Sequence, residues 1–309
     1  MLEAIADRFS TSPRSPVLHS PAEHGLDFEE VTFPSEDGIP LEGWFVPAPG
    51  SDRIVIVNHP RFFSRSGLPS HLEPWRSVNG ETGNDIEVDL VPDIALLHTA
   101  GYHVLAYDLR NFGLSGAANG GVTTSGRLES RDVVGSLRYA RSRPDLRGAR
   151  IALFSRCLGA DATLFAMQRA PREFTDVCCL VACQPLSPRA VLERTLERRG
   201  IPAELMDERM EELDRLIRLR TGFGLDEMSP VETGAAASVR VPTLVYQVHD
   251  DLMTRPDDVQ SMFDTIPADV PKELFWIHGT TRRWDGYLHF QRDPDRILEW
   301  LARHGSPRS

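Results

Sequence analysis

One short stretch, residues 154–160 (Phe-Ser-Arg-Cys-Leu-Gly-Ala), constrains the fold of this chain more than any other. It follows an apolar run that begins at Ile151 and precedes an apolar helical pattern from Ala162 to Met167. We therefore predict a strand, a tight turn of small residues and a helix in direct succession. Such a turn holds the Cys157 thiol at the carboxyl edge of a sheet, with the amino end of the helix beneath it. The alternative is that Cys157 is a small buried hydrophobic residue.

Short apolar runs alternate with helical patterns along most of the chain. Strands are expected at residues 28–33, 41–47, 53–58, 102–107, 151–154, 177–183, 243–248 and 273–277. Helices are expected at residues 93–100, 130–142, 187–221, 256–265 and 293–304. Strands that alternate with helices form a mostly parallel sheet with helices on both faces. The predicted fold class is therefore α/β, with a mostly parallel central sheet.

The charge-rich helical pattern between Ser187 and Thr221 interrupts this alternation, because no strand is evident within it. We interpret it as a mobile helical cap inserted between two core strands, which sets the choice of substrate. Substitutions at Leu205, Met206 or Met210 are then expected to change the preference among acyl chains. The predicted division of the chain is an N-terminal extension (1–26), a first part of the core (27–186), the cap insertion (187–240) and a second part of the core (241–309).

Composition excludes several classes of function. The chain has 309 residues and a net charge of −11, which argues against a nucleic-acid surface and against anionic membranes. No apolar run reaches the length of a membrane span, and the N-terminus has no signal-peptide core. The cysteines, at positions 157, 178, 179 and 183, have neither zinc-site nor disulfide-scaffold spacing. We expect a cytoplasmic protein without metal or cofactor.

Several motifs together resemble the α/β-hydrolase superfamily, over about residues 27–304. His59-Pro60 stands where that family carries His-Gly, and the segment from Gly101 to Ser115 resembles its G-Y-x-V-x-x-x-D-x-R-G-x-G-x-S sequence. Residues 155–159 resemble its nucleophile elbow, G-x-S-x-G, with cysteine at the nucleophile position. A cysteine there is similar to dienelactone hydrolases, whereas the cap is closer to cap-bearing esterases and acyl hydrolases.

The resemblance implies a catalytic relay. Cys157 is the expected nucleophile, and Asp251, which follows a strand, is the expected acid. His289 is the expected base, because it precedes the last helix as the family's histidine does. His278, at the end of the last strand, is the alternative base, although a histidine there also suits a structural role.

The oxyanion hole requires two backbone N–H donors. Leu158, which follows the nucleophile, is expected to supply one. Pro60 has no N–H group, so Arg61 is expected to supply the other, with Phe62 behind it.

Aromatic residues in the loops are expected to line a pocket for an apolar or aromatic acyl substrate. The expected substrate-binding residues are His59, Phe62, Trp284 and Tyr287. For His59 a structural role in fixing its turn stays open, and the aromatic residues could instead pin their loops to the core.

The sequence thus predicts an acyl hydrolase for an ester, a lactone or a thioester, an esterase-, thioesterase- or lactonase-like enzyme. Two alternatives remain. One is a non-hydrolytic enzyme of acyl transfer or cyclisation on the same fold. The other is a non-catalytic ligand-binding protein. Assembly into a homo-oligomer is left open.

Overall fold

Alternating side chains of the parallel strands divide between two apolar layers in the computed structural model, which describes residues 1–305. Ile54 and Ile56 face one layer, while Val55 and Val57 face the other. Both sets are buried, as expected for a sheet covered by helices on both sides. The strands are β1 (Glu29–Pro34), β2 (Pro40–Val46), β3 (Arg53–Asn58), β4 (Gly67–Pro69), β5 (Glu87–Asp89), β6 (His103–Tyr107), β7 (Arg150–Arg156), β8 (Val177–Cys183), β9 (Thr243–Val248) and β10 (Lys272–Ile277).

The main sheet has eight strands in the order β1-β2-β6-β3-β7-β8-β9-β10. β2 is antiparallel to both of its neighbours, and every pairing from β6 to β10 is parallel. The predicted fold class is therefore confirmed. Because the parallel strands point the same way, the loops after β3, β7, β8 and β9 meet at one edge of the sheet.

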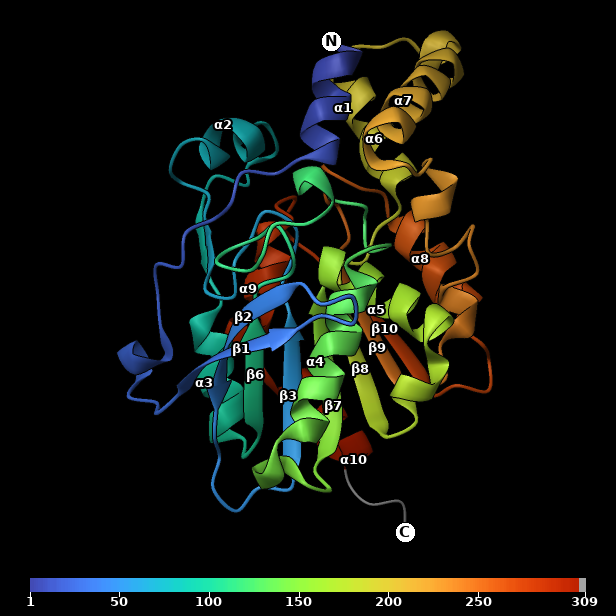
Figure 1. Cartoon of the computed structure of the whole chain (residues 1–309). Helices are drawn as coiled ribbons and strands as arrows, with labels where there is room; N and C mark the ends of the chain where they lie inside the picture. Colours follow the sequence, from blue (N-terminus) through green and yellow to red (C-terminus); the bar gives the residue numbers. More distant parts are fainter. Residues whose placement is uncertain (306–309) are drawn as a thin grey trace.

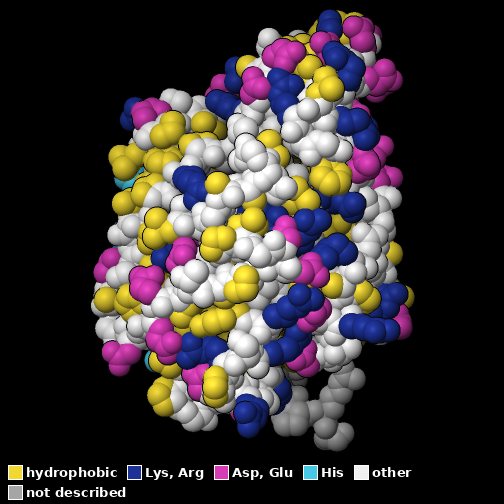
Figure 2. All heavy atoms as spheres, viewed as in Figure 1, with side chains coloured by type: hydrophobic (Ala, Val, Ile, Leu, Met, Phe, Trp, Pro, Cys, Tyr) yellow, Lys and Arg dark blue, Asp and Glu magenta, His cyan; other side chains and the backbone are white. Residues whose placement is uncertain are grey.

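Helices cover both faces of the sheet and also form a layer beyond its carboxyl edge. They are α1 (Leu2–Ser10), α2 (Trp75–Asn79), α3 (Val91–Thr99), α4 (Ser130–Ser142), α5 (Leu158–Arg169), α6 (Pro188–Arg198), α7 (Met206–Thr221), α8 (Pro256–Thr265), α9 (Trp284–Arg292) and α10 (Asp295–Gly305). α4, α5 and α8 pack on one face, and α3, α9 and α10 pack on the other. Charged side chains of both signs are interspersed over the surface shown in Figure 2.

A separate layer of helices lies beyond the carboxyl edge of the sheet, at the top of Figure 1. It contains α6 and α7, both within the range predicted as a cap, and also α1 from the N-terminal extension. Phe9 of α1, Leu192 of α6 and Leu213 of α7 belong to one apolar cluster. Arg220 of α7 forms ion pairs with two acidic residues of α1. The later part of the predicted cap differs, because Ala236 and Val239 pack in the core cluster with α5.

The crossing of α5 over β3 is very close. A Cβ on Gly159 would lie 2.7 Å from both the Cβ and the carbonyl oxygen of Asn58, so the site admits only glycine. The Asn58 side-chain amide donates to the Ser155 hydroxyl over 2.8 Å, and that hydroxyl also bonds Thr163 over 2.9 Å. These bonds explain how serine fits where the family motif has its first glycine: its buried hydroxyl is fully engaged.

We predict that Gly159→Ala destabilises the fold by about 1–3 kcal/mol, because the added methyl group overlaps the Asn58 backbone. Chemical denaturation measures this loss. Gly80→Ala is the matched control, since its nearest neighbour lies 3.9 Å from a new Cβ and its φ of −63° suits alanine. Equal stability of the two variants would contradict the close packing of α5 on β3.

Candidate functional site

Cys157 occupies a strained turn between β7 and α5. Its φ of 47° and ψ of −114° lie outside the regions that side chains with a Cβ favour. The Cys157 N–H donates to the carbonyl of Cys183 over 2.8 Å, which ties the turn to the end of β8. Strain of this kind costs about 1–3 kcal/mol and is concentrated at functional sites. The turn places Cys157 at the amino end of α5, as the sequence predicted.

The cysteine lies in the wall of a cavity of about 580 Å³ between the sheet edge and the cap. α1 and α6 supply its outer wall, and the loops after β3 and β7 supply its floor. The lining residues are Met1, Ala4, Ile5, Arg8, Phe9, Arg61, Phe62, Val78, Asn79, Glu81, Thr82, Ser125, Cys157, Leu158, Asp161, Leu186, Val191, Leu192, Thr195, Arg198, Arg199, Met253, Arg283, Trp284 and Tyr287. No residue of α7 belongs to this wall, so Met206 and Met210 are not in it.

Six of the predicted site residues lie together in this wall: Cys157, Leu158, Arg61, Phe62, Trp284 and Tyr287. The other four, His59, Asp251, His278 and His289, do not line it. None of the histidines among residues 1–305 is part of the wall. The structure therefore places the cysteine at the expected position without bringing the expected base to the cavity.

His289 lies on α9 with its ring against Tyr246 and Phe275, with centroid separations of 5.8 and 5.5 Å. It therefore contacts β9 and β10 on the face of the sheet that α9 covers. The alternative base, His278, is exposed and lies 5.0 Å from the ring of His249. The expected base is thus displaced because the loop after β10 leads directly into α9, which turns residue 289 away from the cavity.

His59 is buried beneath the loop that follows β3. Its Nδ1–H donates to the Pro60 carbonyl over 2.6 Å, and its Nε2 accepts the N–H of Leu109 over 2.9 Å. Burial lowers the pKa of His59, so the neutral ring fits both contacts. With both nitrogens engaged by backbone, His59 has the structural role that the sequence left open, rather than a substrate-binding one.

Arg283 is the ion-pair partner of Asp251, the predicted acid, in place of a histidine. Its Nη1 lies 2.7 Å from the Asp251 carboxylate, and both side chains are 1% exposed. Its Nε donates to the Tyr287 hydroxyl over 3.0 Å, and Tyr287 lines the same wall as Cys157. Burial raises the pKa of Tyr287 well above its usual value, so the hydroxyl stays protonated. A chain of contacts thus runs from Asp251 through Arg283 to Tyr287 in the wall that holds Cys157.

Asp161 is a wall residue that the sequence did not mark as functional. It lies one turn beyond Cys157 on α5, and its Oδ1 accepts the N–H of Leu186 over 3.2 Å. Burial, followed by the charge of Cys157, raises the pKa of Asp161 well above the usual value. The spacing of four residues on a helix, which places two side chains on one face, was the available signal.

The loop that carries Arg61 and Phe62 is held in place by Asp108, which follows β6. The Asp108 carboxylate accepts the N–H of Arg65 over 2.6 Å and pairs with its guanidinium over 2.5 Å. Phe62 has a φ of 73°, so the backbone turns sharply at this point. Among the residues described, neither the Arg61 nor the Phe62 N–H donates a hydrogen bond to the protein. Together with Leu158 at the start of α5, these groups are free donors beside the cysteine.

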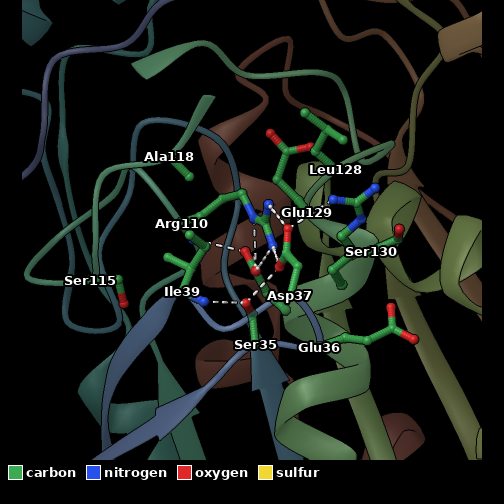
Figure 3. A network of polar contacts seen from close by, with 12 residues as sticks. Ser35, Glu36, Asp37, Ile39, Arg110, Ser115, Ala118, Leu128, Glu129 and Ser130 are labelled. Atoms are coloured by element: carbon green, nitrogen blue, oxygen red, sulfur yellow. Dashed lines mark hydrogen bonds and ion pairs between the residues drawn. The ribbon is translucent and has the colours of Figure 1, made fainter. Parts of the chain in front are cut away.

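A second charged cluster holds the loop after β6 and lies outside the cavity wall. In Figure 3 the Arg110 side chain points toward Asp37, which lies in the loop between β1 and β2. Arg110 also pairs with Asp132 of α4 over 2.8 Å, and both of these side chains are buried. Burial raises the pKa of Asp132 to about 7. The cluster fixes the loop after β6 against α4 and against the loop between β1 and β2.

Two further features bear on ligands and on membranes. Within residues 1–305, no group of three or more His, Cys, Asp or Glu side chains is arranged to hold a metal ion. No helix in the same range is both long and apolar enough to cross a bilayer.

Sequence comparison identifies distant relatives of unknown activity. No protein-family model matches the chain. Proteins described as uncharacterized protein YfhR, from Escherichia coli K12 and from strain O157:H7, are each 26% identical to it over 148 residues. This match spans 47% of the chain and 43% of the length of those relatives.

Structural comparison gives broader agreement. The esterase Pf2001 of Pyrococcus furiosus is 22% identical, with a TM-score of 0.67 and coverage of 97% of this chain and 99% of that one. The α/β hydrolase GrgF from Penicillium is 18% identical, with a TM-score of 0.59 and coverage of 90% and 99%. At these identities the likeness concerns the fold alone. The strand order, the turn at Cys157 and these neighbours together show that the chain has the α/β-hydrolase fold.

Proposed function

We propose that the chain is an acyl hydrolase in which Cys157 attacks the carbonyl of an activated ester, lactone or thioester. The observation that carries this proposal is the strained turn that holds Cys157 in the wall of a 580 Å³ cavity. Backbone strain on residues other than glycine is concentrated at active sites and ligand-binding sites. The thiolate is the nucleophilic form of cysteine, and Cys157 lies at the amino end of α5 in the same wall as Arg61 and Tyr287.

In this proposal Asp161 replaces the histidine as the group that moves the proton. Burial raises the pKa of Asp161, which makes its carboxylate a stronger base than that of an exposed aspartate. Asp161 accepts the thiol proton as the sulfur bonds to the carbonyl carbon, and the carbonyl electron pair moves to oxygen. The oxygen is held by the N–H groups of Leu158 and of Arg61 or Phe62. When the C–O or C–S bond of the donor breaks, the leaving group takes the proton from Asp161.

Hydrolysis of the resulting thioester completes the cycle. A water molecule attacks the acyl carbon and gives one proton to Asp161, and the C–S bond to Cys157 then breaks. The proton returns from Asp161 to the sulfur. Arg283, held by Asp251, keeps its charge near the sulfur and orients Tyr287 throughout. Attack by an alcohol or amine in place of water would give acyl transfer or cyclisation, and product analysis separates these outcomes.

Non-catalytic binding of a small ligand is the second candidate function. The observation that favours it is that no histidine within residues 1–305 lines the cavity, while Arg283 engages the expected acid. Intact-mass analysis after exposure to a panel of aryl esters, lactones and thioesters separates the two candidates. A covalent acyl adduct on Cys157 supports catalysis, whereas reversible binding without any adduct or turnover supports a binding protein.

Cys157→Ala is expected to abolish turnover and adduct formation, because no other group in the cavity wall can carry the acyl chain in this mechanism. Steady-state hydrolysis of an aryl ester and intact mass measure both effects. Cys178→Ala is the control, since Cys178 lies on β8 outside the wall. Full activity of the Cys157 variant would overturn the covalent mechanism.

Asp161→Asn is expected to lower the rate by about a hundredfold or more, since it removes the proton acceptor but keeps the shape of the side chain. His289→Ala is expected to have little effect, because its ring lies outside the cavity wall. Rates measured with one aryl ester compare the variants. A crippled His289 variant beside an active Asp161 variant would restore the relay of Asp251 and His289.

The substitution Asp161→Asn should also stabilise the fold. Because the folded-state pKa of Asp161 is raised, the folded protein loses stability as the pH rises from the unfolded-state pKa toward the folded-state pKa. Asparagine does not ionise, so Asp161→Asn should raise Tm more at pH 8 than at pH 4.5. Asp258→Asn is the matched control, a largely buried carboxyl with a raised pKa that bonds the Ser187 N–H. It should share the stability effect without the loss of rate.

Substrate choice should depend on α1 and α6, which supply the outer wall of the cavity. Ile5→Ala and Val191→Ala shorten side chains of that wall and so enlarge the cavity. They should shift the preference toward longer or bulkier acyl chains. Relative rates across a chain-length series measure the shift. Leu205→Ala is the control, because Leu205 is exposed and outside the wall. An unchanged preference in both wall variants would show that acyl groups bind elsewhere.

A further inference from the structure

Arginine is concentrated in the cavity wall, although the chain as a whole has a net charge of −11. The wall contains five arginines but only two acidic residues: Arg8, Arg61, Arg198, Arg199, Arg283, Glu81 and Asp161. An acidic protein with a basic cavity concentrates positive potential where a ligand enters.

Two of these arginines are neutralised by carboxylates. Arg283 pairs with Asp251 over 2.7 Å, and Arg199 pairs with Glu81 over 3.0 Å. Asp161 accepts the N–H of Leu186, and among the described residues it forms no ion pair with any of these arginines. The excess positive charge of the cavity therefore belongs to the other three arginines.

These three unpaired arginines, Arg8, Arg61 and Arg198, have no carboxylate partner among the described residues. Arg61 donates only to neutral oxygens, including the carbonyl of Arg8 over 2.7 Å. Arg198 likewise donates to the Leu252 carbonyl over 2.5 Å and to a threonine hydroxyl. Within residues 1–305 the guanidinium group of Arg8 makes no hydrogen bond or ion pair with protein. Neutral oxygens satisfy the hydrogen-bond donors of a guanidinium group but do not compensate its positive charge.

The cations also act on one another. Burial lowers the pKa of Arg61 to about 10, and the charge of Arg8 contributes in the same direction. The pKa of Arg198 is lowered by partial desolvation and by the charges of Arg194 and Arg199, against the opposing charges of Glu81 and Asp251. An anion placed among these groups would relieve the repulsion. Arg61 adjoins Cys157, while Arg8 and Arg198 lie in the last turns of α1 and α6, so the positive charge extends from the sulfur to the outer wall.

We propose that the substrate carries a carboxylate or phosphate group, which binds at Arg8 and Arg61 within a positive potential that Arg198 extends, while its apolar part packs between α1 and α6. Guanidinium groups bind both kinds of anion through paired hydrogen bonds. The apolar residues of the same two helices, such as Ile5 and Leu192, would contact the remainder of the molecule. The assignment of this anionic molecule as an acyl donor rests on the proposed function, but its binding to the cavity does not.

The first test measures the cavity's charge selectivity without any acyl chemistry. Cys157 is alkylated with iodoacetate, which is anionic, and with iodoacetamide, which is neutral and similar in size. The ratio of the two rates, relative to the same ratio for free cysteine, should exceed one. Arg8→Gln and Arg198→Gln should each lower it by about two- to threefold, as expected for losing one solvent-exposed charge near the sulfur. Peptide mapping restricts the measurement to Cys157.

Arg215→Gln is the matched control. Arg215 is an exposed arginine on α7, outside the cavity wall, with no ion pair among the residues described. It should leave the iodoacetate-to-iodoacetamide ratio unchanged. A wild-type ratio at or below that of free cysteine, or equal ratios in all of these proteins, would overturn the anion site.

The second test compares aryl esters of butyrate with aryl monoesters of glutarate, which differ by a terminal carboxylate. Wild type should favour the glutarate ester in kcat/KM, and Arg8→Gln should reduce that preference. Protection of Cys157 from iodoacetamide by glutarate or by inorganic phosphate distinguishes a carboxylate from a phosphate ligand. Failure to turn over either ester, with charge-selective alkylation retained, would overturn the acyl hydrolase alone. Turnover without charge selectivity would overturn the anion site alone.

Discussion

The contact between α5 and β3 determines the geometry of everything above the sheet. Because Gly159 lies directly on Asn58, the helix begins at once after the strand, and the backbone has no room for a relaxed turn. Cys157 absorbs the resulting distortion in its own φ and ψ angles. Its N–H bond to the Cys183 carbonyl then fixes the turn relative to the neighbouring strand. A reactive side chain is thereby presented by packing forces that act on the backbone beneath it.

The polar groups around the cysteine follow from how buried charges are compensated. Asp251 is almost fully buried, so it requires a partner, and Arg283 supplies a guanidinium in the place expected for an imidazole. Arginine remains charged at neutral pH and cannot act as a base. The pair can therefore orient Tyr287 and stabilise negative charge, but proton transfer must use another group. Asp161 is the wall residue whose environment shifts its pKa in the direction that such a role requires.

The sequence predicted those parts of the structure that depend on local patterns. The buried strands, the helices between them and the turn at Cys157 each follow from periodicity and from small residues at fixed positions. Leu158 and Arg61 lie in the same wall as the cysteine because they follow the ends of β7 and β3. The position of His289 depended on the course of the loop after β10, which chain order does not specify. The pairing of Asp251 with Arg283 joins residues far apart in sequence, and no local pattern reveals such a contact.

The cap joins two parts of the chain that are widely separated in sequence. α1 packs against α7, and the whole first part of the core, residues 27–186, together with α6 lies between them along the chain. Contacts of such long range form late in folding, because closing a long loop costs conformational entropy before any contact compensates it. We expect the sheet and its flanking helices to assemble first, with α1 docking afterwards. Until α1 docks, the cavity would lack one of the two helices of its outer wall, and the cysteine turn would be open to solvent on that side.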